Sequence, residues 1–291
     1  MRPNREQLAA LLAVVDGGTF EAAALSLHIT PSAVSQRIKS LESQVGQVVV
    51  VRASPCTPTS IGVRLLRLAR QYELIEQEAL LDLDVDAHVI DSPVAVNADS
   101  LATWFPRVFE ELSSRADLQL RLYVDDQVHT TGLMRSATVL GAVTSEQIPV
   151  QGCSIERLGS MRYVPVATPS LVQRHTAGRR IDWQTLPVVR FNAKDDLQHE
   201  ILRGHGVTDP SICHVVPSSE AFAHAVRAGL GWGALPESDL HDALETGRLQ
   251  RLGARLHVDV PLYWQRWRLD SPALDEVSRA VRAAARGGLR R

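Results

Sequence analysis

The strongest constraint on the fold is a pair of short amphipathic segments on either side of a tight turn, within residues 19–43. In the first segment, four apolar side chains recur at the spacing of one helical stripe: Phe20, Ala23, Ala24 and Leu27. The turn at 28–29 is followed by Thr30, a favoured helix N-cap, and by Pro31, which suits the first helical position. The pattern predicts a helix-turn-helix.

The second helix of this pair carries a polar face opposite its apolar stripe. Val34, Ile38 and Leu41 form the stripe, and four polar side chains lie opposite: Ser32, Ser35, Gln36 and Lys39. Hydroxyls, an amide and a cation on one rigid helix suit the base edges and phosphates of a DNA major groove. A merely solvated helix face would carry the same residues, so the pair alone leaves both interpretations open.

The flanking sequence favours the DNA-binding interpretation. An apolar stripe over residues 5–15 predicts a third helix, and the β-branched run at 47–52 predicts a strand. Three helices and a β-ribbon make a winged helix-turn-helix, in which Arg52 could reach a phosphate or the minor groove. Residues 1–72 hold eight Lys and Arg against four Asp and Glu, a balance of +4; the formal net charge of −2 therefore leaves −6 on the rest.

A long helix is predicted behind this unit, from residue 60 to about residue 86. Its apolar residues follow a heptad seam: Ile61, Leu65, Leu68, Tyr72, Ile75 and Ala79. Such a seam directly behind a DNA-binding unit favours pairing of two copies, which would place two recognition helices on successive major grooves. The alternative is a helix that packs on its own domain.

From residue 91 onward the pattern changes to alternating strands and helices. The expected strands are 93–97, 118–124, 138–143, 163–167, 187–191, 213–217 and 261–269, and the expected helices are 101–115, 127–136, 220–228 and 272–286. This alternation predicts an α/β body with a parallel-rich sheet, divided into two small lobes with a cleft between them.

Polar residues gather where three of the expected strands end, which is where ligands bind in open α/β sheets. These candidate effector-binding residues are Asn97, Asp99, Ser100, Asp125, Asp126, Thr144 and Ser145. Helix N-termini at Ser100 and Thr144 would offer N–H donors to a carboxylate. Asp99, Asp125 or Asp126 would accept from an ammonium group, and several acids together suit an amino acid with a cationic side chain. Ordinary helix caps and a turn would explain the same residues without a ligand.

Motifs that suggest catalysis or a cofactor do not hold in this sequence. The G-L-G-W-G run at 229–233 follows an expected helix and precedes a strand, the reverse of a dinucleotide loop. His199 begins H-E-x-x-R, which lacks the second histidine of a zinc protease. The three cysteines are far apart, and no apolar run suits a membrane span or secretion signal. We therefore expect a cytoplasmic protein without metal or cofactor, and we interpret Trp104 and Phe191 as core residues.

Residues 1–88 resemble the LysR-type transcriptional regulators. The similarity lies in LAALLAVVDGGTFEAAA, LHITPSAVSQRIKSLE, the strand VVVVR, the wing end PTSIG and the long helix, and it extends through AGLGWGALP and the two-lobed body. The chain is more narrowly similar to the LysG/ArgP branch, whose members control basic amino acid export, in NADSLATWF, VDDQVHTTGLM and SPCTPTSIG.

The resemblance implies a homodimer or dimer of dimers that binds double-stranded promoter DNA and contacts RNA polymerase. It implies a small-molecule effector between the lobes, here L-lysine, L-arginine or L-histidine, and no other cofactor. It also implies DNA contacts from the early recognition helix and the wing arginine, which are Thr30, Ser32, Ser35, Gln36, Arg37, Lys39 and Arg52. Arg37 rests mainly on the resemblance.

The predicted organisation is a winged helix-turn-helix domain at 1–58, a linker and dimerisation helix at 59–88 and an effector-binding domain at 89–291. This last domain is expected to resemble a periplasmic binding protein, with lobe I at about 92–162 plus 267–291 and lobe II at about 163–266. The predicted function is activation of a basic amino acid exporter gene. The alternatives are an architectural or replication-origin DNA-binding protein without a regulatory ligand, and an enzyme, for which no nucleophile–base pair is evident.

Overall fold

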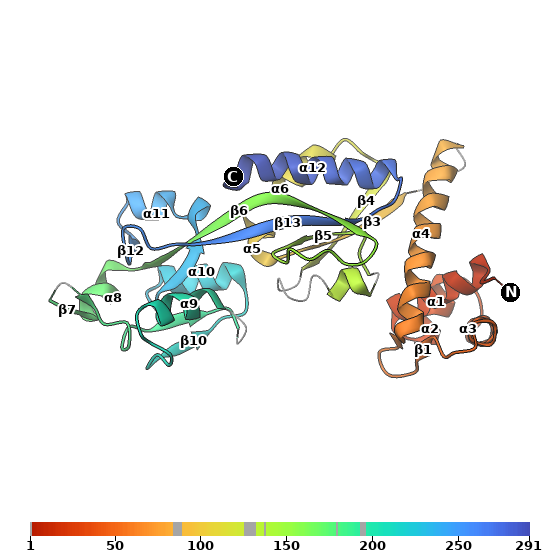
Figure 1. The fold of residues 1–291 in the computed structure, drawn as a ribbon, viewed down its shortest axis with the longest axis horizontal. Helices are drawn as coiled ribbons and strands as arrows, with labels where there is room; N and C mark the ends of the chain where they lie inside the picture. Colours follow the sequence, from red (N-terminus) through yellow and green to blue (C-terminus); the bar gives the residue numbers. More distant parts are fainter. Residues whose placement is uncertain (1, 84–88, 125–131, 137, 179, 193–195) are drawn as a thin grey trace.

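The computed structural model describes residues 2–83, 89–124, 132–136, 138–178, 180–192 and 196–291. The molecule is elongated, with a helical N-terminal unit at one end, the long helix α4 beside it, and a two-lobed α/β body extending away from them (Figure 1). The predicted effector residues Asp125 and Asp126 lie outside the described residues. The structure therefore bears on the other predicted effector residues.

Three helices and a short β-ribbon form the N-terminal unit: α1 (Arg5–Gly17), α2 (Phe20–Ser26), α3 (Pro31–Val45), β1 (Val50–Val51) and β2 (Thr57–Pro58). The hydroxyls of Thr19 and Thr30 cap α2 and α3 by accepting from backbone N–H groups of the first turn, as the sequence predicts. Gly18, at φ 69°, ends α1 in the left-handed conformation that glycine adopts without strain. The antiparallel wing strands are two residues each, shorter than the apolar run at 47–52 suggests.

The long helix α4 (Ser60–Asp82) packs one face on its own chain and leaves another exposed. Leu65 is 9% exposed in the core shared with α1, and Ile61 and Leu68 are partly buried against the same core. The assignment of Leu65 to a dimer seam is therefore wrong, because its side chain already packs within the chain. Tyr72 and Ile75 are 56% and 54% exposed, so the later part of the seam is open to a partner.

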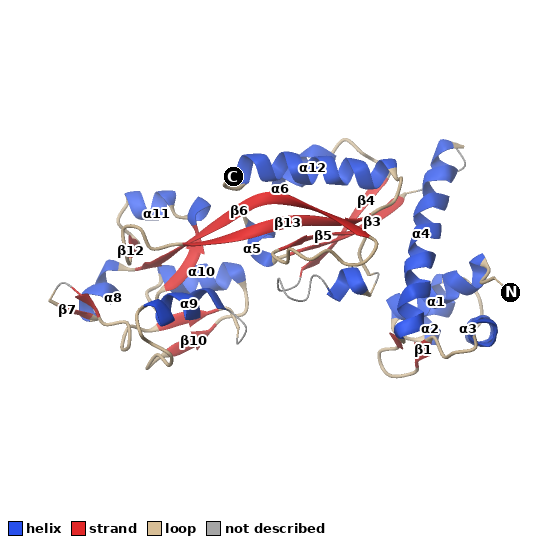
Figure 2. Ribbon diagram, viewed as in Figure 1, coloured by secondary structure: helices blue, strands red, loops and turns tan. Residues whose placement is uncertain are grey.

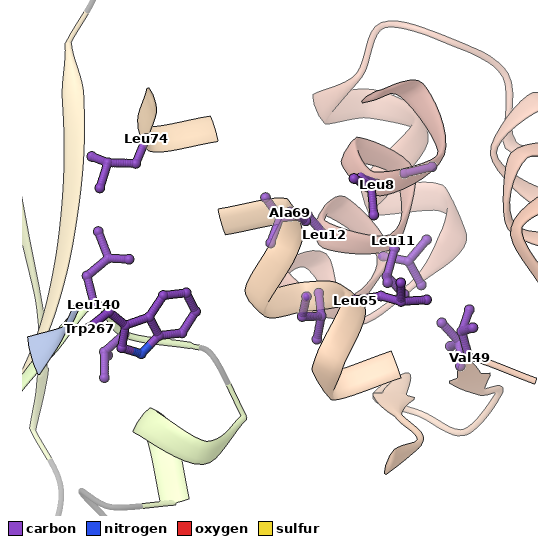
Figure 3. Close-up of a cluster of buried hydrophobic side chains, with 14 of the residues drawn as sticks. Leu8, Leu11, Leu12, Val49, Leu65, Ala69, Leu74, Leu140 and Trp267 are labelled. Carbon is purple, nitrogen blue, oxygen red and sulfur yellow. The ribbon is translucent and has the colours of Figure 1, made fainter. Parts of the chain in front are cut away.

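Helix α4 also contacts the α/β body of its own chain. Leu74 is 2% exposed and lies near Leu140 and Trp267 of the body (Figure 3). The Glu78 carboxylate accepts from Ser271 Oγ at 2.6 Å and from the Ala273 backbone N–H at 3.1 Å, at the start of the last helix. These contacts dock the body on the helix that follows the DNA-binding unit.

One mixed sheet of seven strands runs through both lobes: β3 (Ile90–Val96), β4 (Leu118–Val124), β5 (Gly141–Thr144), β6 (Cys153–Ala167), β11 (Gly233–Pro236), β12 (Gln250–Arg251) and β13 (Val258–Trp267). Its order is β11-β6-β13-β5-β3-β4, with β12 paired to β6. Strand β3 is parallel to β4 and β5, whereas β13 is antiparallel to β5 and β6, and β11 is antiparallel to β6. The expected parallel pattern holds for β3, β4 and β5 and is wrong for the rest of the sheet.

The antiparallel part arises from two long strands, β6 and β13, that cross between the lobes (Figure 2). Strand β6 begins at Cys153 rather than near residue 163. The sequence pattern missed its first half because the exposed Glu156 and Arg157 lie outside the apolar run that marks the second half. Residues 263–266 of β13 pair with β5 of the first lobe. Strand β13 is thus shared by both lobes, and the boundary expected at about residue 267 stays a prediction.

Three helices pack on the strands of the first lobe: α5 (Ala98–Ala102), α6 (Pro106–Leu112) and α12 (Pro272–Gly288). The single helix expected over 101–115 is divided, because Pro106 has no N–H for the backbone ladder and starts α6 instead. Trp104, between these helices, is 2% exposed in the core, as expected. Of the helix expected at 127–136, the described residues 132–135 are helical.

The second lobe adds short elements: α8 (Pro169–Arg174), β7 (Thr176–Ala177), β8 (Arg180–Ile181), β9 (Val188–Arg190), α9 (Asp196–Gly204), β10 (Cys213–Val215), α10 (Ser219–Arg227), the 3-10 helix η1 (Glu237–Asp239) and α11 (His241–Glu245). Strands β9 and β10 are parallel and form a small sheet of their own. The G-L-G-W-G run at 229–233 lies after α10 and leads into β11, as predicted, and Gly229 has φ 79°.

Within the described residues, no single helix is long and apolar enough to cross a membrane. Helices α1 and α2 reach that length and composition only when joined, and they meet at a bend of 119°.

Candidate functional site

The predicted DNA-reading face lies on α3, whose rotation is set by its buried side. Val34, Ile38 and Leu41 are each 0% exposed in the core of the N-terminal unit. The opposite face turns to solvent and carries the exposed Ser32, Gln36 and Lys39 with the half-buried Ser35. The arrangement presents hydrogen-bond donors and a cation on a rigid helix, as reading a major groove requires.

The other three predicted DNA-binding residues have contacts within the chain. Thr30 caps α3 with its hydroxyl. An Arg37 guanidinium nitrogen lies 3.0 Å from the carboxylate of Glu6 on α1. The exposed Arg52 guanidinium lies 4.7 Å from the centroid of the Phe20 ring, a cation–π contact that holds the wing against the start of α2.

A cavity of about 580 Å³ lies between the two lobes of the body. Its walls come from α5 and the residue after β5 in the first lobe, from α9, α10 and the β11–η1 segment in the second, and from the crossing strands β6 and β13. A cavity of this size suits a small molecule. Its lining extends from Asn97 to Pro261 in the sequence.

Asp99 connects the two lobes at this cavity. Tyr163 Oη on β6 donates to one carboxylate oxygen of Asp99 at 2.8 Å, and Ser219 Oγ, at the start of α10, donates to the other at 2.8 Å. Hydrogen bonds to an ionised group are stronger than neutral ones, so they stabilise this junction between α5 and the second lobe. Asp99 therefore lines the cavity, as predicted, with a hydrogen bond to each of its oxygens.

Three of the predicted effector residues line the cavity: Asn97, Asp99 and Ser145. Asn97 is 4% exposed, and its Oδ1 has no hydrogen-bond partner. Ser100 and Thr144 are buried and do not line it. Ser100 is the third residue of α5, within its first turn, and Thr144 ends β5 without leading into a described helix. The expectation that Thr144 begins a helix is therefore wrong, and the assignment of Ser100 as an N–H donor to a carboxylate stays a prediction.

Most of the acids that line the cavity escape the sequence patterns above: Asp196, Glu200, Glu220, Asp239 and Asp259. Asp196 and Glu200 lie one turn apart on α9, and Glu220 lies in the first turn of α10. Helices α9 and α10 follow β9 and β10. Polar residues after these two strand ends are therefore a signal in the sequence that would have identified Asp196, Glu200 and Glu220. Phe191, expected in the core, is half-buried and also lines the cavity.

The cavity carries an excess of negative charge. Among its described lining residues the one arginine or lysine is Arg227. Burial raises the pKa of the Asp239 carboxyl, while a hydrogen bond from Ser238 and the charge of Arg227 oppose this rise and the charge of Asp99 adds to it. Asp259 is held by Arg162 in a bidentate pair with both N···O distances at 2.7 Å, and these hydrogen bonds lower the pKa of Asp259.

No group of three His, Cys, Asp or Glu side chains in the described part of the chain is arranged to hold a metal ion. Cys56 and Cys153 are buried and Cys213 is exposed, and all three are free thiols.

Two family models match the chain. Residues 5–63 match the bacterial regulatory helix-turn-helix protein, lysR family, and residues 94–286 match the LysR substrate binding domain. The first covers the winged unit with the predicted DNA-reading face of α3, and the second covers the body with the cavity.

Relatives and solved structures agree with these matches. The lysine export transcriptional regulatory protein LysG of Corynebacterium efficiens is 47% identical over 289 residues, which is 99% of both chains. The structure of full-length LysG from Corynebacterium glutamicum with bound effector Arg is 44% identical, with a TM-score of 0.84 over 99% of this chain and 100% of that one. The crystal structure of ArgP from Mycobacterium tuberculosis is 46% identical, with a TM-score of 0.87 over 98% of both chains. The chain therefore belongs to the LysR family of bacterial helix-turn-helix transcriptional regulators.

Proposed function

We propose that this protein binds promoter DNA as a dimer or dimer of dimers and activates a basic amino acid exporter gene when lysine, arginine or histidine occupies the cavity. The similar proteins named above include a lysine export regulator and a LysG with bound Arg as effector. Both observations concern those proteins. The negative charge of this chain's own cavity supports the same kind of ligand here.

The observation that carries the proposal is the charge of the cavity. Six acids line it, namely Asp99, Asp196, Glu200, Glu220, Asp239 and Asp259, against the single described arginine, Arg227. Carboxylates in a partly enclosed space attract a cation more strongly than they would in bulk water. A ligand with a cationic side chain therefore gains energy that a neutral amino acid does not.

The proposed DNA contacts come from α3 and the wing. Ser32, Ser35, Gln36 and Lys39 would reach base edges and phosphates, since the buried side of α3 turns them outward. Thr30, Arg37 and Arg52 would contact the DNA phosphate backbone at the edges of this face. Arg37 would do so after its ion pair with Glu6 breaks.

The proposed dimer contact is the exposed later part of α4. Tyr72 and Ile75 remain open to solvent, and Leu68 lies at the edge of the same stripe. Large apolar side chains at heptad spacing suit pairing with a second copy.

The alternatives receive less support. An architectural DNA-binding protein has no use for an acidic cavity of about 580 Å³ between two lobes. The relatives are transcriptional regulators, and we assign the cavity to ligand binding rather than to catalysis. We place the protein in the cytoplasm, where the DNA is.

Calorimetry on the full-length protein tests the proposal. L-arginine, L-lysine and L-histidine are titrated beside L-citrulline and L-norleucine, which lack the side-chain cation. We expect at least one basic amino acid to bind and the neutral analogues to bind at least about tenfold more weakly. Absence of binding by all three basic amino acids would reject the sensor function.

A further inference from the structure

The acids that line the cavity differ in whether another group already satisfies them. Asp99 accepts from Tyr163 and Ser219 at 2.8 Å each. Asp259 is paired with Arg162, and Asp239 accepts from Ser238 Oγ at 3.1 Å with Arg227 as a nearby positive charge. These carboxylates therefore have little to gain from a further cation.

The remaining three carboxylates lack such partners. Asp196, Glu200 and Glu220 have no hydrogen-bond or ion-pair partner among the described residues, and all three line the cavity. Asp196 and Glu220 sit in the first turns of α9 and α10, where the helix dipole also favours acids. The dipole does not account for Glu200, one turn further along α9, where it adds to the negative charge of Asp196.

A second, independent feature lies on the opposite wall. Asn97 belongs to the first lobe, lines the same cavity and is 4% exposed, yet its Oδ1 has no hydrogen-bond partner. A buried acceptor without a donor lowers stability, so a ligand that supplies an N–H donor there is favoured. An amino acid carries such a donor in its α-ammonium group.

We propose that Asp196, Glu200 and Glu220 of the second lobe bind the side-chain cation of the amino acid, while Asn97 of the first lobe accepts a hydrogen bond from its α-ammonium group. The inference rests on the proposed function and specifies how the cavity selects its ligand. A basic amino acid then spans both lobes, with one positive group on each wall. Asp99 acts as the hydrogen-bonded connection between the lobes rather than as the cation receptor.

The charge on the second lobe is tested with the double variant Asp196→Asn plus Glu200→Gln. Calorimetry measures the ratio of the L-citrulline to the L-arginine dissociation constant, because citrulline differs from arginine mainly in its side-chain charge. We expect this ratio to fall about tenfold or more, with citrulline affinity unchanged. The matched control is Glu110→Gln plus Glu111→Gln, which removes the same charge from exposed positions on α6 and should leave the ratio intact.

The role of Asp99 provides the opposing test. Asp99→Asn should weaken arginine and citrulline together and leave their ratio unchanged, since it perturbs the contact between the lobes. A ratio that collapses in Asp99→Asn and stays intact in the α9 double variant would overturn the inference and move the cation site to the first lobe.

The role of Asn97 is tested with 5-guanidinopentanoic acid, which is arginine without its α-ammonium group. Asn97→Ala should weaken arginine about tenfold and leave the binding of this analogue unchanged. Equal loss for both ligands would reject the hydrogen bond. If the parent protein binds no basic amino acid, the proposed function fails; if it binds arginine and none of the variants shifts these ratios, only the present inference fails.

Discussion

The predicted DNA-reading face of α3 and the cavity between the lobes are built in opposite ways. The face comes from residues 30–39 of one helix, and its exposed side follows from the burial of Val34, Ile38 and Leu41. The cavity gathers residues between 97 and 261 from both lobes and the crossing strands. The geometry of a site on one helix follows from the helical spacing of its residues. The geometry of a site between two lobes depends on how the sheet packs.

The largest change is expected in the stability of the N-terminal unit, with ligand binding by the body unaffected. Ile38→Ala removes a fully buried side chain beneath the reading face, and we expect a loss of about 2–5 kcal/mol in the unfolding free energy of the N-terminal unit. Urea denaturation checks this, and calorimetry with L-arginine should show unchanged binding by the body at low urea. Simultaneous loss of arginine binding would show that the two regions do not behave independently.

The next effect concerns the exposed part of α4, which belongs to neither site. Tyr72→Glu plus Ile75→Glu would place carboxylates in the apolar seam of the proposed dimer, and we expect the dimer dissociation constant to rise about 100-fold. Sedimentation velocity measures the change. Leu25→Glu, a similar substitution at a position 79% exposed on α2, is the control. A dimer of unchanged affinity in the double variant would place the interface elsewhere.

The reading face is tested by its charge and its hydroxyls. Ser35→Ala plus Lys39→Ala should weaken binding to a duplex selected from a random pool, with the salt slope of log K reduced by about 0.9 for one lost phosphate contact. Fluorescence anisotropy at several salt concentrations checks this, and the melting temperature should stay constant. Arg174→Ala removes a cation from α8 in the second lobe, and a similar loss there would indicate an effect of total charge alone.

The smallest effect lies at the junction between the two regions. Burial raises the pKa of Asp91, although Arg121 at 3.1 Å lowers it in part, so the folded state holds this proton more tightly than the unfolded state. The contribution of Asp91 to stability is therefore present below its ordinary pKa of 3.8 and is lost as the pH rises through the folded value. Relative to the parent, Asp91→Asn should be more stable at neutral pH than in acid. Urea denaturation at both pH values measures this, and a constant difference would contradict it.

Local sequence patterns succeeded where one element decides its own geometry. Thr19 and Thr30 cap their helices as predicted, and Gly18 ends α1. The division of the helix expected over 101–115 was also readable in principle, because Pro106 lies inside it.

The same patterns failed where distant elements meet. Leu65 has the heptad spacing of a dimer contact, yet α1 already covers it. The direction of β6 and β13 in the sheet depends on long-range pairing, which a pattern of alternating elements does not encode.

Four features could be predicted from the sequence: the helix-turn-helix, the outward face of α3, the two-lobed α/β body and the excess of acids in that body. Helical periods, caps and charge are properties of short segments, so they can be identified without knowing the neighbours. Which acids face one cavity, and which of them already have a hydrogen-bond donor, depends on contacts between distant segments. Asp99 meets Tyr163 and Ser219 across the lobes, while Glu200 meets no such donor among the described residues. That difference depends on how the two lobes pack, because hydrogen bonds form over a few ångströms in space, whatever the separation along the chain.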